Sequence, residues 1–555
     1  MRQRRRLSLK IVLHPIALLR RASPELLTSV LFVAWILPGL FGHDPWKPDE
    51  GYGFGLVNHI VQGGSWVVPT LAGEPFMEKP PLYYLTAAAL ATAFSPPLAL
   101  HDAARLATVL YMGLTAFFIW LSARALFGRA QAHFAVIVLL GCVGLLVHAH
   151  QLITDIALLS GFAIGLYGLI HAAQRPTVGG AWLGAGAGIG FMAKGLLAPG
   201  VLALSALALP LTSKTWRTRR HLVFIAAAAL SICPWLLWWP LMLHQLSPPL
   251  FSEWMWDNNF GRFFGLNNLG PRADTLDHLR TIPWFTFPAL PLAVWALWSG
   301  YRRGYTPGQV CLLVFFCVTL GVLSISHDAR ELYALPLLLP LALLAVPGIE
   351  RLPAAVGSGW YRINVVGFTV LVATIWATWI ALEFGVPATV QQKLLTFNPG
   401  YIPAFSWIAF LTAVVYTALW AGTIRWLAAG RARSIIIWTM GLCVTWALAM
   451  TLLLGWVDAG KTYRSVVASL RAALPGHYDC IAGLNIGESE RAMLEYFGGI
   501  RTVTEKNGSR ADCTLLLVQT RSPAERSAPE NHNPLWEGGR PGNARERFLL
   551  YRRTP

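Results

Sequence analysis

Acidic and basic side chains stand beside long apolar runs of this sequence, where charge is costly and commonly has a function. Asp49 and Glu50 follow the first apolar run, and a Glu78-Lys79 pair lies later in the same polar segment. Asp155 opens another apolar run, in HAHQLITDIALLSGF. A carboxylate can act as a base or orient an acceptor, and a cation can neutralise a leaving phosphate. These acids could instead cap helices or form solvated loop pairs.

Four basic residues are expected on the same side of the membrane as these acids, namely Lys79, Lys194, Arg262 and Arg330. Arg offers a planar fork of donors that suits phosphate, and Lys offers a point charge. We therefore predict that they bind a phosphate, although each could instead anchor its loop at the membrane interface. Together the acids and cations favour a reaction on a lipid-linked phosphate.

The composition places these residues in a membrane protein. Of 555 residues, 55% are hydrophobic and 13% are charged, whereas soluble domains carry about 25% charged residues. With a mean hydropathy of +0.51, this excludes an ordinary cytoplasmic enzyme, a disordered chain and a fibrous repeat. The net charge of +17 is assigned to cytoplasmic loops, so we expect membrane lipids and no nucleic acid as partners.

About thirteen apolar runs approach the roughly 20 residues that a membrane helix needs. The sequence therefore predicts a mainly α, polytopic membrane protein. Two runs meet at Lys194, where Gly-rich flanks favour a tight hairpin. The runs are 26–42, 105–123, 132–149, 155–173, 181–193, 195–211, 222–243, 284–299, 308–325, 334–349, 363–384, 404–424 and 435–457.

Charge sets the orientation of these runs. The basic N-terminal tail, MRQRRRLSLK, is expected inside, and 21 of the 30 Lys and Arg in residues 1–457 then fall on the inner side. Of the 16 Asp and Glu in that stretch, all but Glu25 and Glu350 fall outside. Acids contribute little to orientation, so their gathering on the outer face hints at function. The division is a membrane part, 1–457, with outer loops 43–104 and 244–283, and an outer domain, 458–555.

The residues from 458 to 555 are predicted to form a small α/β domain. YDCIAGLNI, IRTVTE, DCTLLLVQT and RFLLYRR are typical of strands, SERAMLEYFGG of a helix, and 521–544 of a loop. Cys480 and Cys513 each begin a predicted strand, so a disulfide and two free thiols are both open. In the first outer loop, EGYGFGLVNHIVQGG and LYYLTAAALATAF predict two interfacial helices.

The first outer loop carries a resemblance. KPDEGY, then QGGSWVVPTLAGEPFMEKPPLYY, resembles the first periplasmic loop of the bacterial aminoarabinose transferases of lipid A and the wider protein-mannosyltransferase-like group. The similarity continues through TDIALL, MAKGLLAPG, NNFGRFFG and the Tyr-Leu-Pro-rich run near residue 333, and covers essentially the whole chain.

This resemblance implies a GT-C glycosyltransferase that takes a sugar from a polyprenyl phosphate, here undecaprenyl phosphate, and inverts the anomeric centre. It implies a multi-pass protein of the bacterial inner membrane with its active site facing the periplasm. The implied catalytic acids are Asp49 and Asp155, with Glu50 beside the first. The resemblance places the family's Glu-Lys pair at Glu78 and Lys79 and its phosphate-binding lysine at Lys194. With the outer cations described above, the predicted substrate-binding residues are Lys79, Lys194, Arg262, Arg330, Tyr333 and Tyr52.

Two departures from the aminoarabinose transferases bear on the substrate and on a metal. Tyr52 stands where they usually have Arg, and Asn259 where they usually have His. That His can join the Glu of the Glu-Lys pair in binding a divalent metal, so the resemblance leaves two roles for Glu78: a metal ligand, or an ion-pair partner of Lys79. We expect the ion pair, because amide oxygen is a poorer ligand than imidazole for such a metal.

Other functions remain as alternatives. A membrane transporter or lipid flippase would place polar residues near mid-membrane on broken helices, whereas these acids lie at the ends of spans. A membrane sensor would leave Asp49 and Asp155 without a role. The sugar is not specified, and the acceptor could be lipid A phosphate, another glycolipid, a polysaccharide or a protein hydroxyl. The C-terminal domain is expected to cover the site or guide the acceptor and to do no chemistry itself.

Overall fold

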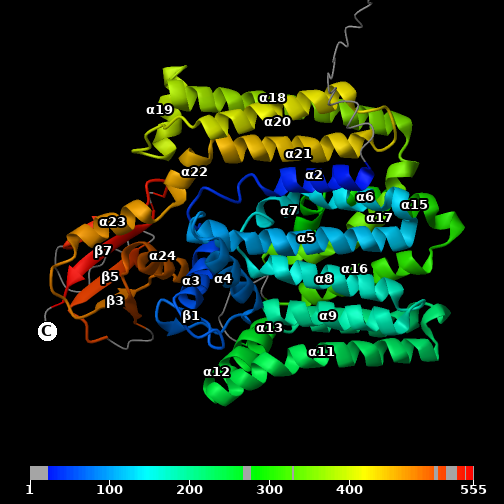
Figure 1. Ribbon diagram of the computed structural model, residues 1–555, viewed down its shortest axis with the longest axis horizontal. Helices are drawn as coiled ribbons and strands as arrows, with labels where there is room; N and C mark the ends of the chain where they lie inside the picture. The colour runs from blue at the N-terminus through cyan, green and yellow to red at the C-terminus, as the bar shows by residue number, and fades with distance from the viewer. Residues whose placement is uncertain are drawn as a thin grey trace, which may run out of the picture.

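Long helices packed side by side form most of the molecule (Figure 1). The computed structural model describes residues 23–266, 277–327, 330–505, 511–520, 534–543 and 545–553. Within them, eight helices are long and apolar enough to cross a membrane, and a pair bent by 94°, Leu279–Phe285 with Ala289–Arg303, forms a ninth candidate. The protein is therefore a multi-pass membrane protein.

Every run predicted as a span is helical over most of its length. The eight long helices are α5 (Leu100–Phe127), α8 (Thr154–His171), α11 (Arg219–Leu246), α16 (Pro307–Ile325), the Glu331–Arg351 stretch made of η4 and α17, α18 (Ala354–Phe384), α20 (Trp407–Trp426) and α21 (Arg433–Leu452). The remaining runs fall in α2 (Pro24–Ile36), α6 (Arg129–Leu140) with α7 (Val143–His148), α9 (Pro176–Lys194), α10 (Leu197–Thr212) and α15 (Ala289–Gly300).

Glycines bring α8 and α9 into close contact. A Cβ atom on Gly161 of α8 would lie 2.7 Å from the carbonyl oxygen of Gly186 on α9, so neither position has room for a larger residue. Small residues are the usual means of close helix approach in membranes. Lys194 ends α9, and Gly195 breaks the helix with φ +76°, which confirms the predicted hairpin with α10. This packing brings the start of α8 beside the end of α9.

The first outer loop folds into α3 (Asp49–Val61), a two-stranded hairpin of β1 (Thr70–Leu71) and β2 (Glu74–Pro75), and α4 (Leu82–Phe94). Both predicted helices are present. The expectation that α3 lies on the membrane surface is wrong, because every residue from Glu50 to Asn58 is buried. Gly51 and Gly55 face α24 (Glu488–Gly498): a Cβ on Gly55 would lie 2.6 Å from Cβ of Ala492.

The C-terminal region, residues 464–553, is the predicted α/β unit. Its sheet has the order β4-β3-β5-β7-β6. The first three strands, β4 (Thr502–Thr504), β3 (Ile481–Leu484) and β5 (Leu515–Thr520), are parallel, and β7 (Arg547–Arg552) and β6 (Trp536–Gly538) complete the sheet in antiparallel fashion. Helices α23 (Arg464–Ala473) and α24 pack against it. The short β6 falls within the stretch expected to be loop, part of which lies outside the described residues.

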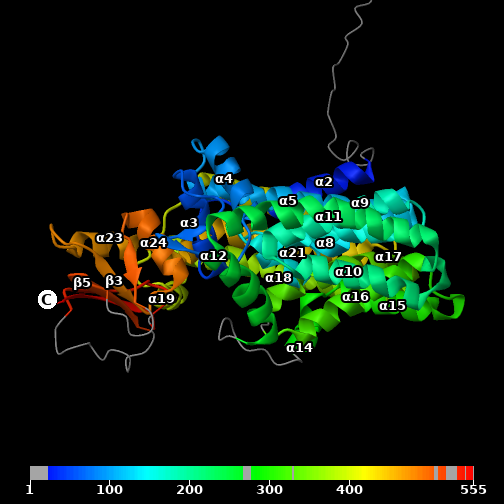
Figure 2. The same ribbon diagram turned by 90° about the horizontal axis from the view of Figure 1, so that it is seen from below.

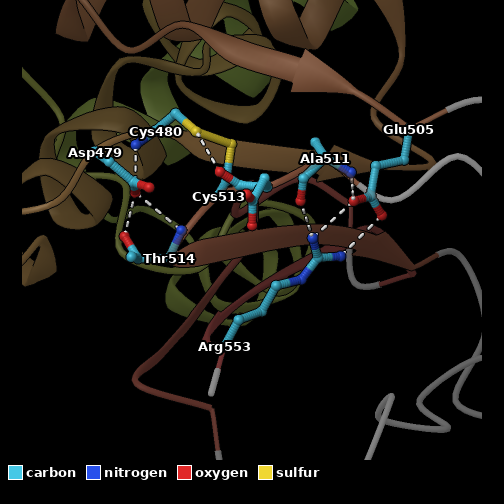
Figure 3. Close-up of a disulfide and its surroundings, with 8 residues drawn as sticks. Asp479, Cys480, Glu505, Ala511, Cys513, Thr514 and Arg553 are labelled. Atoms are coloured by element: carbon cyan, nitrogen blue, oxygen red, sulfur yellow. Dashed lines mark hydrogen bonds and ion pairs between the residues drawn. A yellow bond between two sulfur atoms is a disulfide. The ribbon is translucent and has the colours of Figure 1, made fainter. Parts of the chain in front are cut away.

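The two cysteines of this region form a disulfide, Cys480–Cys513, with Cα atoms 4.9 Å apart (Figure 3). They precede the neighbouring parallel strands β3 and β5, at the same end of each. The alternative of two free thiols is therefore wrong. Asp479 lies beside the bridge and accepts hydrogen bonds from the backbone and hydroxyl of Thr514, which holds the same two strand starts together.

The C-terminal region and the first outer loop lie at one end of the helix bundle. Two views at right angles show the sheet beyond the helix ends, with α3 between the sheet and the bundle (Figures 1 and 2). The segment after α11 reaches this end through α12 (Pro248–Ser252), the π-helical η2 (Glu253–Gly261) and α13 (Arg262–Phe264). The polar elements predicted to carry chemistry therefore meet at one end of the molecule.

Candidate active site

A cavity of about 940 Å³ lies where these elements meet. Its polar wall comes from the first outer loop, the end of α9, η2 with α13, and the start of α24. Its apolar wall comes from α10, α13 and α16, through Leu197, Leu204, Phe264, Val322 and Leu323. Eight of the ten site residues expected from the sequence line it: Asp49, Tyr52, Glu78, Lys79, Lys194, Arg262, Arg330 and Tyr333.

Asp49 is the first residue of α3 and is held by two partners. Arg330 binds both of its carboxylate oxygens, with Nη1 2.8 Å from Oδ1, and the Tyr52 hydroxyl donates to Oδ1 at 2.9 Å. Burial alone would raise the pKa of Asp49, but the Arg330 hydrogen bonds and the charge of Lys79 lower it to about 2. Asp49 is therefore a fixed negative charge with few free lone pairs.

Tyr52 connects Asp49 to Lys79. Its hydroxyl donates to Asp49 and accepts a hydrogen bond from Lys79 Nζ, which also lies 4.7 Å from the centre of the Tyr52 ring. Three residues separate Asp49 and Tyr52, so one turn of α3 places both on the same face. Tyr52, which departs from the aminoarabinose transferase pattern, therefore links the Asp49 carboxylate to the Lys79 ammonium group through its hydroxyl.

Asp155 and Lys194 form an ion pair at the contact between α8 and α9. Lys194 Nζ lies 2.5 Å from Asp155 Oδ1 and 3.9 Å from the centre of the Tyr333 ring. Lys194 faces the cavity, whereas Asp155 stands behind it and does not line the cavity. The carboxylate offsets the cost of burying the lysine and fixes its position.

Glu78 pairs with Arg262, whose Nη1 lies 3.1 Å from Oε2 of the glutamate. The expected pair with Lys79 is therefore wrong, because Lys79 donates to Tyr52 instead. Asn259 is engaged by backbone: its Oδ1 accepts from Leu196 N at 3.2 Å, and its Nδ2 donates to the carbonyl of Trp254 at 2.8 Å. No cluster of three His, Cys, Asp or Glu ligands occurs in the described part of the chain. The donors around Glu78 do not fit a metal.

Glu50 lies outside the cavity and is fully enclosed. Arg105 Nε donates to its Oε1 at 2.7 Å, and the backbone amide of Trp46 donates to its Oε2 at 3.0 Å. Arg105 also binds Asp102 at 2.7 Å. The arrangement suits a structural ion pair that holds the loop before Asp49, in place of the catalytic role expected from the sequence. Arg105 is the first residue of a predicted span, 105–123, so the sequence alone gives no sign of its pairing with Glu50.

The C-terminal region contributes residues to the cavity that were not expected there. Glu488, Ser489 and Glu490, at the start of α24, all line it. Glu490 Oε1 lies 3.1 Å from Nζ of Lys47, and Ser489 donates to the carbonyl oxygen of Pro48. Glu488 and Glu490 are acids in the first turn of α24, but no local pattern in the sequence links that helix to residues more than 400 positions earlier.

Long apolar helices joined to a C-terminal α/β region beside a charged cavity make a fold similar to that of a solved GT-C glycosyltransferase. The family model of dolichyl-phosphate-mannose-protein mannosyltransferases matches residues 78–238. The crystal structure of ArnT from Cupriavidus metallidurans bound to undecaprenyl phosphate has the same fold, with a TM-score of 0.68, 17% identity, and 95% of this chain and 97% of that chain covered.

Sequence relatives agree with this fold. Undecaprenyl phosphate-alpha-4-amino-4-deoxy-L-arabinose arabinosyl transferase of Pseudomonas savastanoi pv. phaseolicola is 27% identical over 58% of this chain and 60% of its own length. The Pseudomonas fluorescens enzyme of that name is 26% identical over 70% and 68%, and the Sodalis glossinidius enzyme 30% over 57% and 57%. The chain thus spans about three fifths of the first of these relatives. The resemblance seen in the sequence is confirmed as a similarity: the chain is similar to these arabinosyl transferases in sequence and to ArnT in fold.

Proposed function

We propose that the protein is an inverting glycosyltransferase. It takes a sugar from the polyprenyl carrier undecaprenyl phosphate and transfers it to an acceptor on the outer side of the membrane. The observation that carries this proposal is the two-sided cavity. An apolar wall suited to a polyprenyl chain stands beside Lys79, Lys194, Arg262 and Arg330. Relatives named for an undecaprenyl phosphate donor support it.

The cations suit the leaving group. Lys79 and Lys194 neutralise the donor phosphate, and negative charge grows on that phosphate as the sugar–oxygen bond breaks. Interactions that strengthen in the transition state accelerate the reaction. The fixed carboxylate of Asp49 faces the positive charge that develops at the anomeric carbon, as in other glycosyl transfers. Asp155 positions Lys194 and does not itself touch the sugar.

The same proposal sets the orientation of the molecule. The cavity end faces the periplasm, the protein resides in the bacterial inner membrane, and about thirteen segments cross or enter the bilayer. Residues 1–457 form the catalytic membrane part, and 458–555 form a periplasmic domain. Membrane lipids surround the former. The sugar is left open, because Tyr52 and Asn259 depart from the aminoarabinose transferase pattern.

The test is transfer by purified protein in liposomes. Undecaprenyl phosphates carrying different labelled sugars, aminoarabinose among them, are offered, and released undecaprenyl phosphate is measured. We expect release with one donor, and a loss of about 10²-fold in Lys194→Met. Lys214→Met is the control, because Lys214 lies at the far end of α10. Movement of the lipid across the bilayer without cleavage of the sugar would instead identify a flippase.

A further inference from the structure

Among the acids that line the cavity, Glu488 differs in having no cation bound to it. Asp49 pairs with Arg330, and Glu78 pairs with Arg262. Glu490 is likewise paired with a lysine. The carboxylate of Glu488 makes no ion pair or hydrogen bond with any described residue, yet it lines the same cavity and is accessible from it. Its lone pairs are therefore available to a substrate.

Glu488 also has a fixed position relative to Asp49. Each is the first residue of its helix, α24 and α3. The two helices pack closely, since a Cβ on Gly51 would lie 2.9 Å from Cβ of Ser489. Ser489, next to Glu488, donates to the carbonyl oxygen of Pro48, next to Asp49. The two carboxylates thus enter one cavity from two helices that pack directly against each other.

Asp49 is poorly suited to accept a proton. Arg330 occupies both of its oxygens, and its pKa is lowered to about 2. A general base works best when its pKa lies near the operating pH. An acceptor hydroxyl needs such a base, because its own pKa is far above 7, whereas an acceptor phosphate is already ionised.

The surroundings of Glu488 tune it for that task. Partial removal from water is the main cause that raises the pKa of Glu488, and the negative charge of Glu78 raises it further. The positive charges of Lys79, Arg491 and Arg262 lower this pKa. The net effect raises the pKa of Glu488 to about 7. A carboxylate with such a pKa suits an acceptor hydroxyl, which must lose its proton during transfer.

We propose that Glu488 is the catalytic base of the reaction and that the acceptor is an alcohol. This rests on the proposed glycosyl transfer. The acceptor O–H gives its proton to the Glu488 carboxylate while its oxygen forms a bond to the anomeric carbon. The bond from that carbon to the phosphate oxygen breaks, and its electron pair leaves with undecaprenyl phosphate. Asp49 stays ionised and balances the charge at the sugar.

The test compares Glu488→Gln with Glu495→Gln, a glutamate of the same helix that pairs with Arg501 away from the cavity. Release of undecaprenyl phosphate is measured from pH 5 to 9 with octyl glucoside as the alcohol and, separately, with lipid A as the phosphate. Wild type and Glu495→Gln should accelerate as pH rises to about 7. Glu488→Gln should lose at least about 10²-fold in kcat with the alcohol and show no such pH dependence.

Binding separates chemistry from folding. Glu488→Gln should bind undecaprenyl phosphate as wild type does, and Glu488→Asp, which keeps a carboxylate, should recover part of kcat and the pH dependence. An unchanged pH profile in Glu488→Gln would refute the role of Glu488 as base. Faster transfer to lipid A phosphate than to the alcohol in wild type would refute the alcohol acceptor. Failure of wild type to cleave any donor would instead refute the proposed glycosyl transfer itself.

Discussion

At the scale of single residues, the site works through pairs whose partners are far apart in the sequence. Asp49 is held by Arg330, Glu78 by Arg262 and Lys194 by Asp155. Burying one charge without its partner costs several kcal/mol, so each carboxylate holds its cation in place. A bound phosphate then does not need to order the cation itself. The cavity is thereby organised before substrate arrives.

Replacing Asp49 by Asn keeps the size of the side chain but removes the charge that faces the sugar. We expect kcat to fall by about 10²–10³-fold, because charge stabilisation at a developing cation is lost. Binding of undecaprenyl phosphate should hold or strengthen, since Arg330 loses its carboxylate partner and becomes available to the phosphate. Single-turnover kinetics and lipid binding on the same preparation measure both. Near-normal kcat in a folded variant would contradict this role.

Replacing Tyr52 by Phe removes the hydroxyl between Asp49 and Lys79 and leaves the ring. A hydrogen bond to a charged group contributes about 1.5–3 kcal/mol, so transfer should slow by about 10–100-fold. Tyr111→Phe is a matched control, because its hydroxyl bonds Thr86 outside the cavity. Equal rates in the two variants would show that the relay through Tyr52 has no part in transfer.

At the scale of secondary structure, glycine contacts place the charged residues. The approach of α8 to α9 brings the start of one helix beside the end of the other, and with them Asp155 and Lys194. The approach of α3 to α24 does the same for Asp49 and Glu488. In both places the contact between helix backbones sets the distance between functional side chains. Substitution of these glycines should therefore change the positions of the site residues, although the glycines do not line the cavity.

Gly186→Ala tests this directly. The new Cβ would lie 2.5 Å from the carbonyl oxygen of Gly161, so α8 and α9 must separate. We expect a cost of about 1–3 kcal/mol and weaker binding of undecaprenyl phosphate. Gly113→Ala in α5, where nothing lies within 4 Å, should be neutral or stabilising. Thermal unfolding in detergent and lipid binding distinguish the two. Identical behaviour would mean that this contact does not position Lys194.

At the scale of the whole molecule, the C-terminal region and the first outer loop form one structure. Lys47 is bound by both Glu490 and Glu546, and Asp44 pairs with Arg464 at 2.6 Å. These ion pairs join the C-terminal region to the loop that carries Asp49, which is more than a cover over the cavity requires. Its removal near residue 457 should therefore impair donor binding as well as acceptor use.

The disulfide acts within this region. Cys480 and Cys513 close a loop of 33 residues, and chain entropy assigns such a bridge about 3–4 kcal/mol. We expect the Cys480→Ser, Cys513→Ser double variant to unfold at lower temperature, with kcat near wild type below that temperature, because the bridge lies away from the cavity. Calorimetry with and without reductant measures the difference. A reductant-insensitive wild type would contradict the bridge.

Much of this organisation could be predicted from the sequence. Apolar length locates the helical runs, and residue type and position beside those runs indicate the charged site residues, Asp49, Lys79, Lys194 and Arg330. The pairings could not be predicted in this way. Arg262 rather than Lys79 binds Glu78, and Glu488 reaches the cavity from a separate region, because such contacts depend on tertiary packing that no local pattern records.

The close contact of α3 with α24 has a consequence for exchange of parts between related enzymes. Gly51 and Gly55 fit Ser489 and Ala492 without spare room. A chimera that receives a foreign C-terminal region must therefore also receive the first outer loop of the same parent. These two segments, separated by most of the chain, should be inherited together, whereas the helices between them are free to diverge on their lipid-facing sides.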